Sequence, residues 1–265
     1  QACLRSGEHR LVRYGKDSDY FDIQLPCGSG IDVLITPHPD SSLVQALQQA
    51  YVERSVLELA IRLPDLTYQT HPKPGQGQHA RRPPQSRQLS RSELSSSTLS
   101  FSKTYHPRTR IVVAGRGAIF ESFLAMAKLF DVELLACSPG YNDQSEPVQS
   151  GACLMRQFPL RSPGNFNSQW LDTWSAFISL SHDHDWETEI LAKVLESDVF
   201  HIAALGSRKT HARRRALLKS AGLEDAQLQR IRGPAGLHIG GSSPPEIALA
   251  ILAEIVAVGN GKQFP

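Results

Sequence analysis

The chain lacks long hydrophobic runs, a large net charge and a recognisable leader segment. No apolar stretch approaches the roughly 20 residues that a membrane-spanning helix needs. The N-terminus has neither the basic nor the apolar region of a signal peptide. The formal net charge is +2 over 265 residues, which is too small to predict nucleic acid or a membrane surface as the main partner. We therefore expect a cytoplasmic protein that binds neither.

Closely spaced cysteine pairs are also absent. The four cysteines are Cys3, Cys27, Cys137 and Cys153. Their scatter excludes the usual structural zinc spacing, and free thiols are expected because nothing indicates secretion. The first residue is Gln1 and not methionine, so we expect the N-terminal domain to be truncated.

One cysteine lies in a glycine-rich segment, Pro26-Cys27-Gly28-Ser29-Gly30. Apolar residues alternate on both sides of it, in 21–25 and 31–35, which predicts a hairpin with the thiol near its tip. An exposed thiol of this kind could bind molybdenum or another thiophilic metal, or accept sulfur. The alternative is that Cys27 is a small apolar residue that fills space.

The centre of the chain has the pattern of a nucleotide-binding fold. The apolar run 111–114 is typical of a buried parallel strand, and Gly115 and Gly117 follow it directly. Apolar residues at three- and four-residue spacing from Phe120 predict a helix, and 132–135 predicts a second strand. In such folds, ligand phosphates meet free N–H groups at the start of the helix.

Two features of the dinucleotide fingerprint are missing from this element. Its third glycine is replaced by Phe120, and no acidic residue ends the second strand in 136–139. The two glycines therefore have two interpretations, a ligand site or a tight turn alone.

Two further strands end in polar residues. Segment 177–180 leads into Ser181-His182-Asp183-His184-Asp185. The carboxyl ends of strands border the ligand crevice of an open α/β sheet, so His182 and Asp185 are candidate crevice residues. A metal site at the two histidines is one interpretation, and turn or helix-cap residues are the other.

The second of these strands, 199–204, leads into Gly206, Ser207 and Arg208 and then a basic helix. The helix start, the hydroxyl and the guanidinium together predict an anion site. Arg213 and Arg214 are predicted to point elsewhere, into solvent. A purely surface role for the whole basic run is the alternative.

Composition divides the chain into three parts. Residues 69–104 have almost no apolar content, which predicts a flexible linker. We expect a small N-terminal α+β domain in 1–68 and a Rossmann-like doubly wound parallel sheet in 105–265. The fold class is therefore α/β.

Several of these motifs together resemble one protein family. They are the segment around Cys27, His182-Asp183-His184-Asp185, Ala204 to His211, and Gly233-Pro234-Ala235-Gly236-Leu237-His238-Ile239-Gly240 leading to Pro244-Pro245-Glu246. They resemble the XdhC and CoxI proteins, the accessory factors of xanthine dehydrogenase and related molybdenum hydroxylases.

The resemblance implies a cofactor chaperone that is not itself the oxidoreductase. Such a protein binds the molybdenum cofactor (molybdopterin), supports its sulfuration and passes it to the apo-hydroxylase. A cysteine desulfurase and a second copy of the chain are further partners to consider. By position, the resemblance makes Cys27 the thiol and metal ligand. The other cofactor-binding candidates are Gly28, Gly115, Gly117, His182, Asp185, Gly206, Ser207 and Arg208.

This sequence departs from the family pattern at Ser29, where a second glycine is usual, and lacks the segment that normally precedes the hairpin. The main alternative function is an NAD(P)-dependent oxidoreductase on the same fold. A third is a scaffold that uses the basic linker to dock partners.

Overall fold

The computed structural model describes residues 1–18, 29–37, 40–62, 67–73, 100–142, 144–181 and 184–262. The chain divides into two compact units, and each is described by itself. In the described ranges, the first unit comprises residues 1–73 and 100–107, and the second runs from residue 108. No helix within these ranges is both long enough and apolar enough to cross a membrane.

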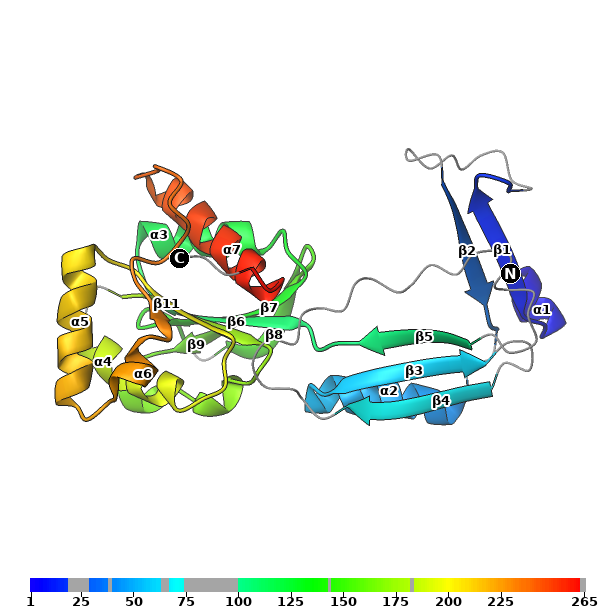
Figure 1. Cartoon of the computed structure of the whole chain (residues 1–265), viewed down its shortest axis with the longest axis horizontal. Helices are drawn as coiled ribbons and strands as arrows, with labels where there is room; N and C mark the ends of the chain where they lie inside the picture. The colour runs from blue at the N-terminus through cyan, green and yellow to red at the C-terminus, as the bar shows by residue number, and fades with distance from the viewer. Residues whose placement is uncertain are drawn as a thin grey trace. The chain divides into compact units, whose positions relative to one another are not determined.

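The first unit contains two small antiparallel sheets and two helices (Figure 1). Helix α1 (Ala2–Ser6) precedes β1 (Arg10–Gly15), which pairs with β2 (Gly30–Ile35). Helix α2 (Ser41–Glu53) leads to the second sheet, whose order is β4-β3-β5. Its strands are β3 (Val56–Arg62), β4 (Thr67–Lys73) and β5 (Ser100–Tyr105).

The predicted linker 69–104 is wrong at both ends. Residues 69–73 belong to β4 and 100–104 to β5, and both strands pair with β3. Leu59 and Ile61 of the central strand are buried and pack with Leu43 of α2. A strand can therefore form from these polar segments because β3 supplies the apolar face. The rest of the predicted linker lies outside the described residues.

The second unit is a doubly wound α/β domain, as predicted. Its seven-stranded sheet has the order β12-β11-β10-β6-β7-β9-β8. The strands are β6 (Thr109–Gly115), β7 (Val132–Ser138), β8 (Gln144–Ser150), β9 (Cys153–Pro159), β10 (Ser175–Leu180), β11 (His201–Ala204) and β12 (Ile231–Arg232). All pairings are parallel except that of β8 with β9. The strand order reverses between β6 and β10, where the chain passes from one half of the sheet to the other.

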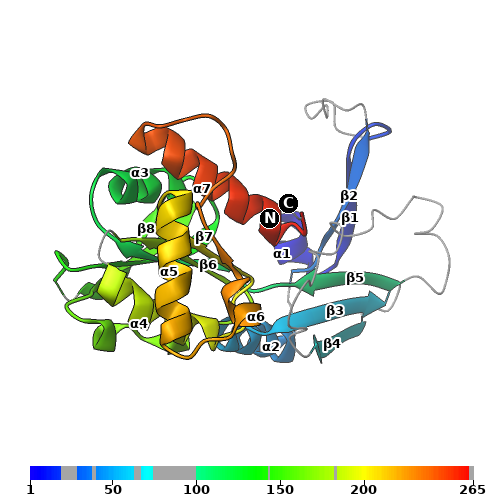
Figure 2. The same ribbon diagram turned by 60° about the vertical axis from the view of Figure 1, so that its left-hand side comes forward.

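Helices cover both faces of this sheet (Figures 1 and 2). The longer ones are α3 (Ala118–Ala127), α4 (His184–Leu195), α5 (Arg208–Ser220) and α7 (Pro244–Gly259), with a short α6 (Asp225–Leu228). Two 3₁₀ turns, η1 (Pro163–Asn165) and η2 (Ser168–Trp170), precede β10. Helices α3 and α7 share one buried cluster with the sheet, and α4, α5 and α6 contribute to the other. The apolar residues of the central strands β6 and β10 therefore alternate between two cores.

The last helix begins with a capping box formed by Ser243 and Glu246. The Glu246 carboxylate accepts hydrogen bonds from the N–H groups of Ser242 and Ser243 and from the Ser243 hydroxyl. These bonds stabilise the ionised carboxyl and hold its pKa below the usual value. The preceding glycine-rich loop is tied to the same helix, because Gly236 donates its N–H to Glu254 at 3.0 Å.

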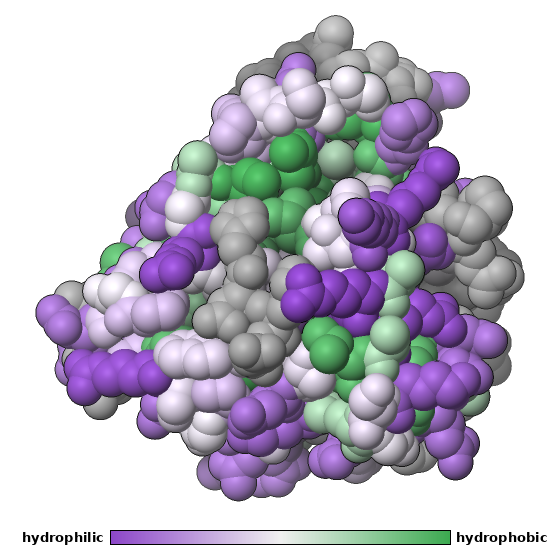
Figure 3. All heavy atoms as spheres, turned by 90° about the vertical axis from the view of Figure 1, so that its left-hand side faces the viewer, coloured by the Kyte–Doolittle hydropathy of each residue, from purple (hydrophilic) through white to green (hydrophobic). Residues whose placement is uncertain are grey.

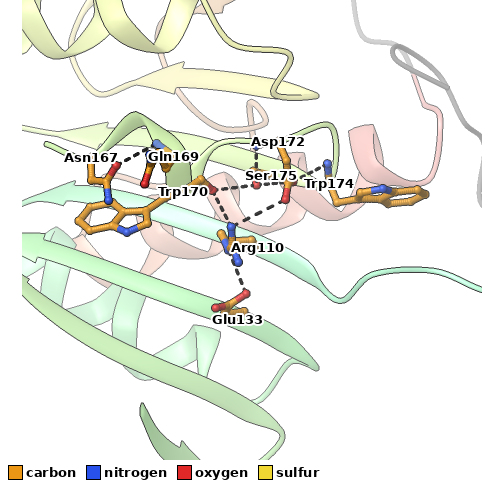
Figure 4. A network of polar contacts seen from close by, with 8 residues as sticks. All are labelled: Arg110, Glu133, Asn167, Gln169, Trp170, Asp172, Trp174 and Ser175. Atoms are coloured by element: carbon orange, nitrogen blue, oxygen red, sulfur yellow. Dashed lines mark hydrogen bonds and ion pairs between the residues drawn. The ribbon is translucent and has the colours of Figure 1, made fainter. Parts of the chain in front are cut away.

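A polar network closes the amino end of the central strands (Figure 4). Arg110 of β6 donates to Glu133 at 2.9 Å and to the Trp170 carbonyl at 2.9 Å. Ser175, at the start of β10, donates to Asp172 at 2.6 Å. The network holds the residues that precede β10 in place. The candidate site residues lie at the opposite end of the sheet, where the parallel strands have their carboxyl ends.

Candidate ligand-binding site at the carboxyl edge of the sheet

Three of the predicted site elements lie at the carboxyl ends of β6 and β11, on either side of β10. Gly115 ends β6, Gly117 is the N-cap of α3, and Gly206 to Arg208 connects β11 to α5. Figure 3 views the second unit from this side and shows hydrophobic patches among hydrophilic side chains. The parallel sheet thus brings to one edge segments that are about 90 residues apart in the sequence.

Gly115 is required by the close approach of β10. A Cβ atom at this position would lie 2.6 Å from the carbonyl oxygen of Leu180, its register partner. Gly117 has a φ of 92° and open space where its Cβ would be. It gives α3 no side-chain cap, so the first N–H groups of this helix face outward without an acceptor from the N-cap.

A pocket of about 160 Å³ lies beside this turn, at the point where the strand order reverses. Its apolar walls come from β6, β10, α4 and the segment after β9. The lining residues are Ala114, Gly115, Arg116, Pro139, Leu160, Phe177, Ser179, Ser181, Trp186, Glu187 and Ile190. Apolar walls with a few polar groups are typical of small-molecule sites.

The inner wall of the pocket carries a buried ion pair. Glu187 of α4 accepts hydrogen bonds from Arg214 Nε at 2.9 Å and from Arg214 Nη2 at 3.1 Å, and both side chains are 1% exposed. Ser179 of β10 donates its hydroxyl to Glu187 at 2.6 Å. Arg214 also donates to the carbonyl of Leu205 at 2.7 Å, so this pair connects the pocket wall to the Gly206 junction.

The prediction that Arg214 points into solvent is therefore wrong, whereas Arg213 is exposed as predicted. Arg214 follows His211 by three positions and precedes Leu218 by four, which places it on the inner stripe of α5. This spacing could have indicated that Arg214 is buried. A buried arginine needs an acidic partner, however, and the sequence pattern does not identify Glu187 as that partner. Ser179 was also missed as a site residue, because its only sequence feature is a single hydroxyl within an apolar strand.

The Gly206 junction combines a turn glycine, a helix cap and two cationic side chains. Gly206 has a φ of 138°, a conformation that favours glycine. The Ser207 hydroxyl caps α5 by accepting the Thr210 N–H at 3.1 Å, so it is engaged within the helix. Arg208 and Lys209 are exposed, and helix geometry leaves their N–H groups without intrahelical acceptors. An anion would therefore meet two N–H groups and two cations.

The remaining candidate residues are Cys27, Gly28, His182 and Asp185. Cys27, Gly28 and His182 lie outside the described residues, and Asp185 is in the first turn of α4 with a side chain that the structure does not describe. In the ranges that are described, no three His, Cys, Asp or Glu side chains lie close enough to hold a metal ion.

The described cysteines are unsuited to thiol chemistry. Cys3, Cys137 and Cys153 are all buried and unpaired. Burial raises the pKa of Cys137 to about 12 and also raises that of Cys153, so both remain protonated thiols near neutral pH. Among the four cysteines, Cys27 thus stays the candidate for such chemistry.

We expect a thiol reagent at pH 8 to leave Cys137 and Cys153 unmodified in the folded chain. The physical reason is that the thiolate is the reactive form, and burial disfavours it. Peptide mass spectrometry after brief alkylation would measure this, with a urea-unfolded sample as the control in which both residues react. Rapid labelling of Cys137 in the folded chain would contradict the structure.

The fold and the edge described above define a Rossmann-type domain with a pocket at the carboxyl ends of its strands. A model of the XdhC Rossmann domain matches residues 111–255. The match covers more than half of the chain, so the chain belongs to the XdhC family, as its motifs indicated.

Comparison with individual proteins agrees with this assignment. The chain is 25% identical over 259 residues to the molybdenum cofactor insertion chaperone PaoD of Escherichia coli, an alignment that covers 96% of this chain and 68% of that protein. It is 23% identical over 232 residues to the uncharacterized protein YqeB of the same organism, covering 83% of this chain and 39% of YqeB.

A solved structure shows the same fold. It is a Bacillus halodurans protein described as a xanthine dehydrogenase, and it superimposes with a TM-score of 0.63 at 20% identity. The match covers 99% of this chain and 79% of that one. At this identity the likeness establishes the fold alone.

Proposed function

We propose that this chain binds the molybdenum cofactor and supports its insertion into a molybdenum enzyme of the xanthine dehydrogenase type. The observation that carries the proposal is the alignment of 96% of the chain with a relative named as a molybdenum cofactor insertion chaperone. Membership of the XdhC family supports it. In this role the chain is a carrier, and the partner enzyme performs the redox reaction.

The phosphate of the cofactor is assigned to the junction after β11. Gly206 allows the turn, the start of α5 supplies the N–H groups of Arg208 and Lys209, and both side chains are cationic. No acidic residue lies in the first turn of α5, so nothing there opposes an anion. The proposal assigns the molybdenum or its terminal sulfur to the thiol of Cys27. Sulfuration, with a cysteine desulfurase as the sulfur donor, belongs to the same proposal.

Replacing Arg208 with alanine should weaken binding of the purified molybdenum cofactor by about 10- to 100-fold, because a charge-assisted hydrogen bond contributes roughly 1.5–3 kcal/mol. The measurement is retention of the cofactor in rapid gel filtration of the full chain. Arg213→Ala is the matched control, since Arg213 is an exposed arginine on the same helix. Equal retention by all three proteins would refute the assignment of the phosphate to this junction.

A further inference from the structure

We propose that the pocket between Gly115 and Trp186 holds a planar heterocyclic ring with an amino or N–H group, a pterin or a nucleobase. The ligand that carries this ring also carries an anionic group outside it. This inference rests on the proposed function and specifies which part of such a ligand enters this pocket. It assigns the ring to β6, β10 and α4, and an anionic group of the same ligand, other than the phosphate assigned to the Gly206 junction, to the turn after β6.

The size and lining of the pocket suit a flat ring. A dry apolar cavity of about 150 Å³ admits a six-membered aromatic ring, and this pocket measures about 160 Å³. Four of its lining residues are apolar side chains that belong to the buried core or pack against it, namely Ala114, Leu160, Phe177 and Ile190. The Trp186 indole adds an aromatic surface, which favours stacking with a second ring.

The hydrogen bonds inside the pocket specify the polarity of the ring. Glu187 already accepts from Arg214 at both carboxylate oxygens, so the Ser179 hydroxyl must donate its single proton to Glu187. The Ser179 oxygen can then only accept a hydrogen bond from a ligand. A ring that contacts this oxygen must therefore present an N–H or amino group, as pterins and nucleobases do.

The charges specify the rest of the ligand. The Glu187 carboxylate is neutralised by Arg214, so the inner wall carries no net charge and suits an uncharged ring. Arg116, which lines the rim, is exposed, and we find no ion pair for it in the described part of the chain. Next to it, the N-cap of α3 is Gly117, which supplies no side-chain cap and leaves open space where a Cβ would be. These groups favour an anionic tail outside the ring.

Calorimetric titration of the full chain tests this inference. The probes are pterin-6-carboxylate, guanosine 5′-monophosphate and cytidine 5′-monophosphate, with ribose 5-phosphate as the anion that lacks a ring. We expect at least one ring-bearing probe to bind and ribose 5-phosphate to bind at least tenfold more weakly. Binding of pterin-6-carboxylate alone identifies a pterin site, and binding of a nucleotide alone identifies a nucleobase site.

A matched pair of serine variants locates the binding. Ser179→Ala should weaken binding of the probe about five- to tenfold, which corresponds to one hydrogen bond. Ser175→Ala is the control because Ser175 is equally buried in β10 and also donates to a carboxylate at 2.6 Å, at the amino end of the strand (Figure 4). It should leave binding unchanged.

A second variant tests the rim without disturbing the core. Arg116→Ala should weaken binding of guanosine 5′-monophosphate about fivefold and leave binding of uncharged guanosine unchanged. The inference is overturned if no ring-bearing probe binds at millimolar concentration, or if Ser179→Ala and Ser175→Ala reduce binding equally. Retention of the intact molybdenum cofactor in either case would mean that this pocket assignment fails while the proposed function stands.

Discussion

Replacing Glu187 with leucine is expected to lower the free energy of unfolding of the second unit by about 3–5 kcal/mol, because it leaves the Arg214 charge buried without its partner. Both side chains are 1% exposed, so water cannot solvate the guanidinium. The Leu205 carbonyl is its remaining close acceptor among the bonds described above. Urea unfolding followed by tryptophan fluorescence measures the loss.

That measurement reports on the second unit alone, because all three tryptophans of the sequence, Trp170, Trp174 and Trp186, belong to it. The double variant Glu187→Leu with Arg214→Met provides the control. It removes both charges and should recover most of the lost stability, since apolar residues of similar size often replace a buried pair at little cost. A double variant as unstable as Glu187→Leu would show that the pair is not the cause.

Replacing Gly115 with alanine is expected to cost about 1–3 kcal/mol, the range for overpacking a tight interior. Its Cβ would lie 2.6 Å from the Leu180 carbonyl oxygen and 2.8 Å from the Leu180 Cβ. The obstacle is therefore mainly backbone, and β6 and β10 would have to separate at their carboxyl ends. The same urea experiment measures this cost.

The strand shift in Gly115→Ala should also distort the adjoining pocket, so binding of any ring-bearing probe should fall with stability. Gly140→Ala is the appropriate control because its Cβ would meet nothing within 4 Å. Its unfolding free energy should change by less than about 0.5 kcal/mol. If Gly115→Ala were as stable as this control, the close approach of the two strands would be wrong.

Sequence patterns located the principal elements of the second unit because its strands are buried on both faces. The runs 111–114 and 177–180 each contain apolar residues and stand at the centre of the sheet as β6 and β10. Polar edge elements gave no such pattern. Strand β8 contains Glu146 and Pro147, and it pairs on one side with β9, so its conformation depends on its neighbour.

At the carboxyl edge of the sheet, the sequence likewise predicted some features and could not predict others. Gly117 and Gly206 could be recognised as turn positions from the strands before them, and the structure places both there, whereas Gly115 is the last residue of β6. The pocket beside them could not be predicted, because its lining combines residues from 114 to 190. The hydrogen-bonding role of Ser179 depends on Glu187 and Arg214, which belong to two different helices.

The sequence by itself determined the α/β class, the doubly wound order of the second unit and the family, because these follow from local hydrophobic periods and short glycine motifs. Only the tertiary structure decided that 69–73 and 100–104 are strands, that Arg214 is buried, and that a pocket lies where the strand order reverses. The physical reason is that pairing, burial and ion pairing depend on partners far apart in the sequence, which no local pattern specifies.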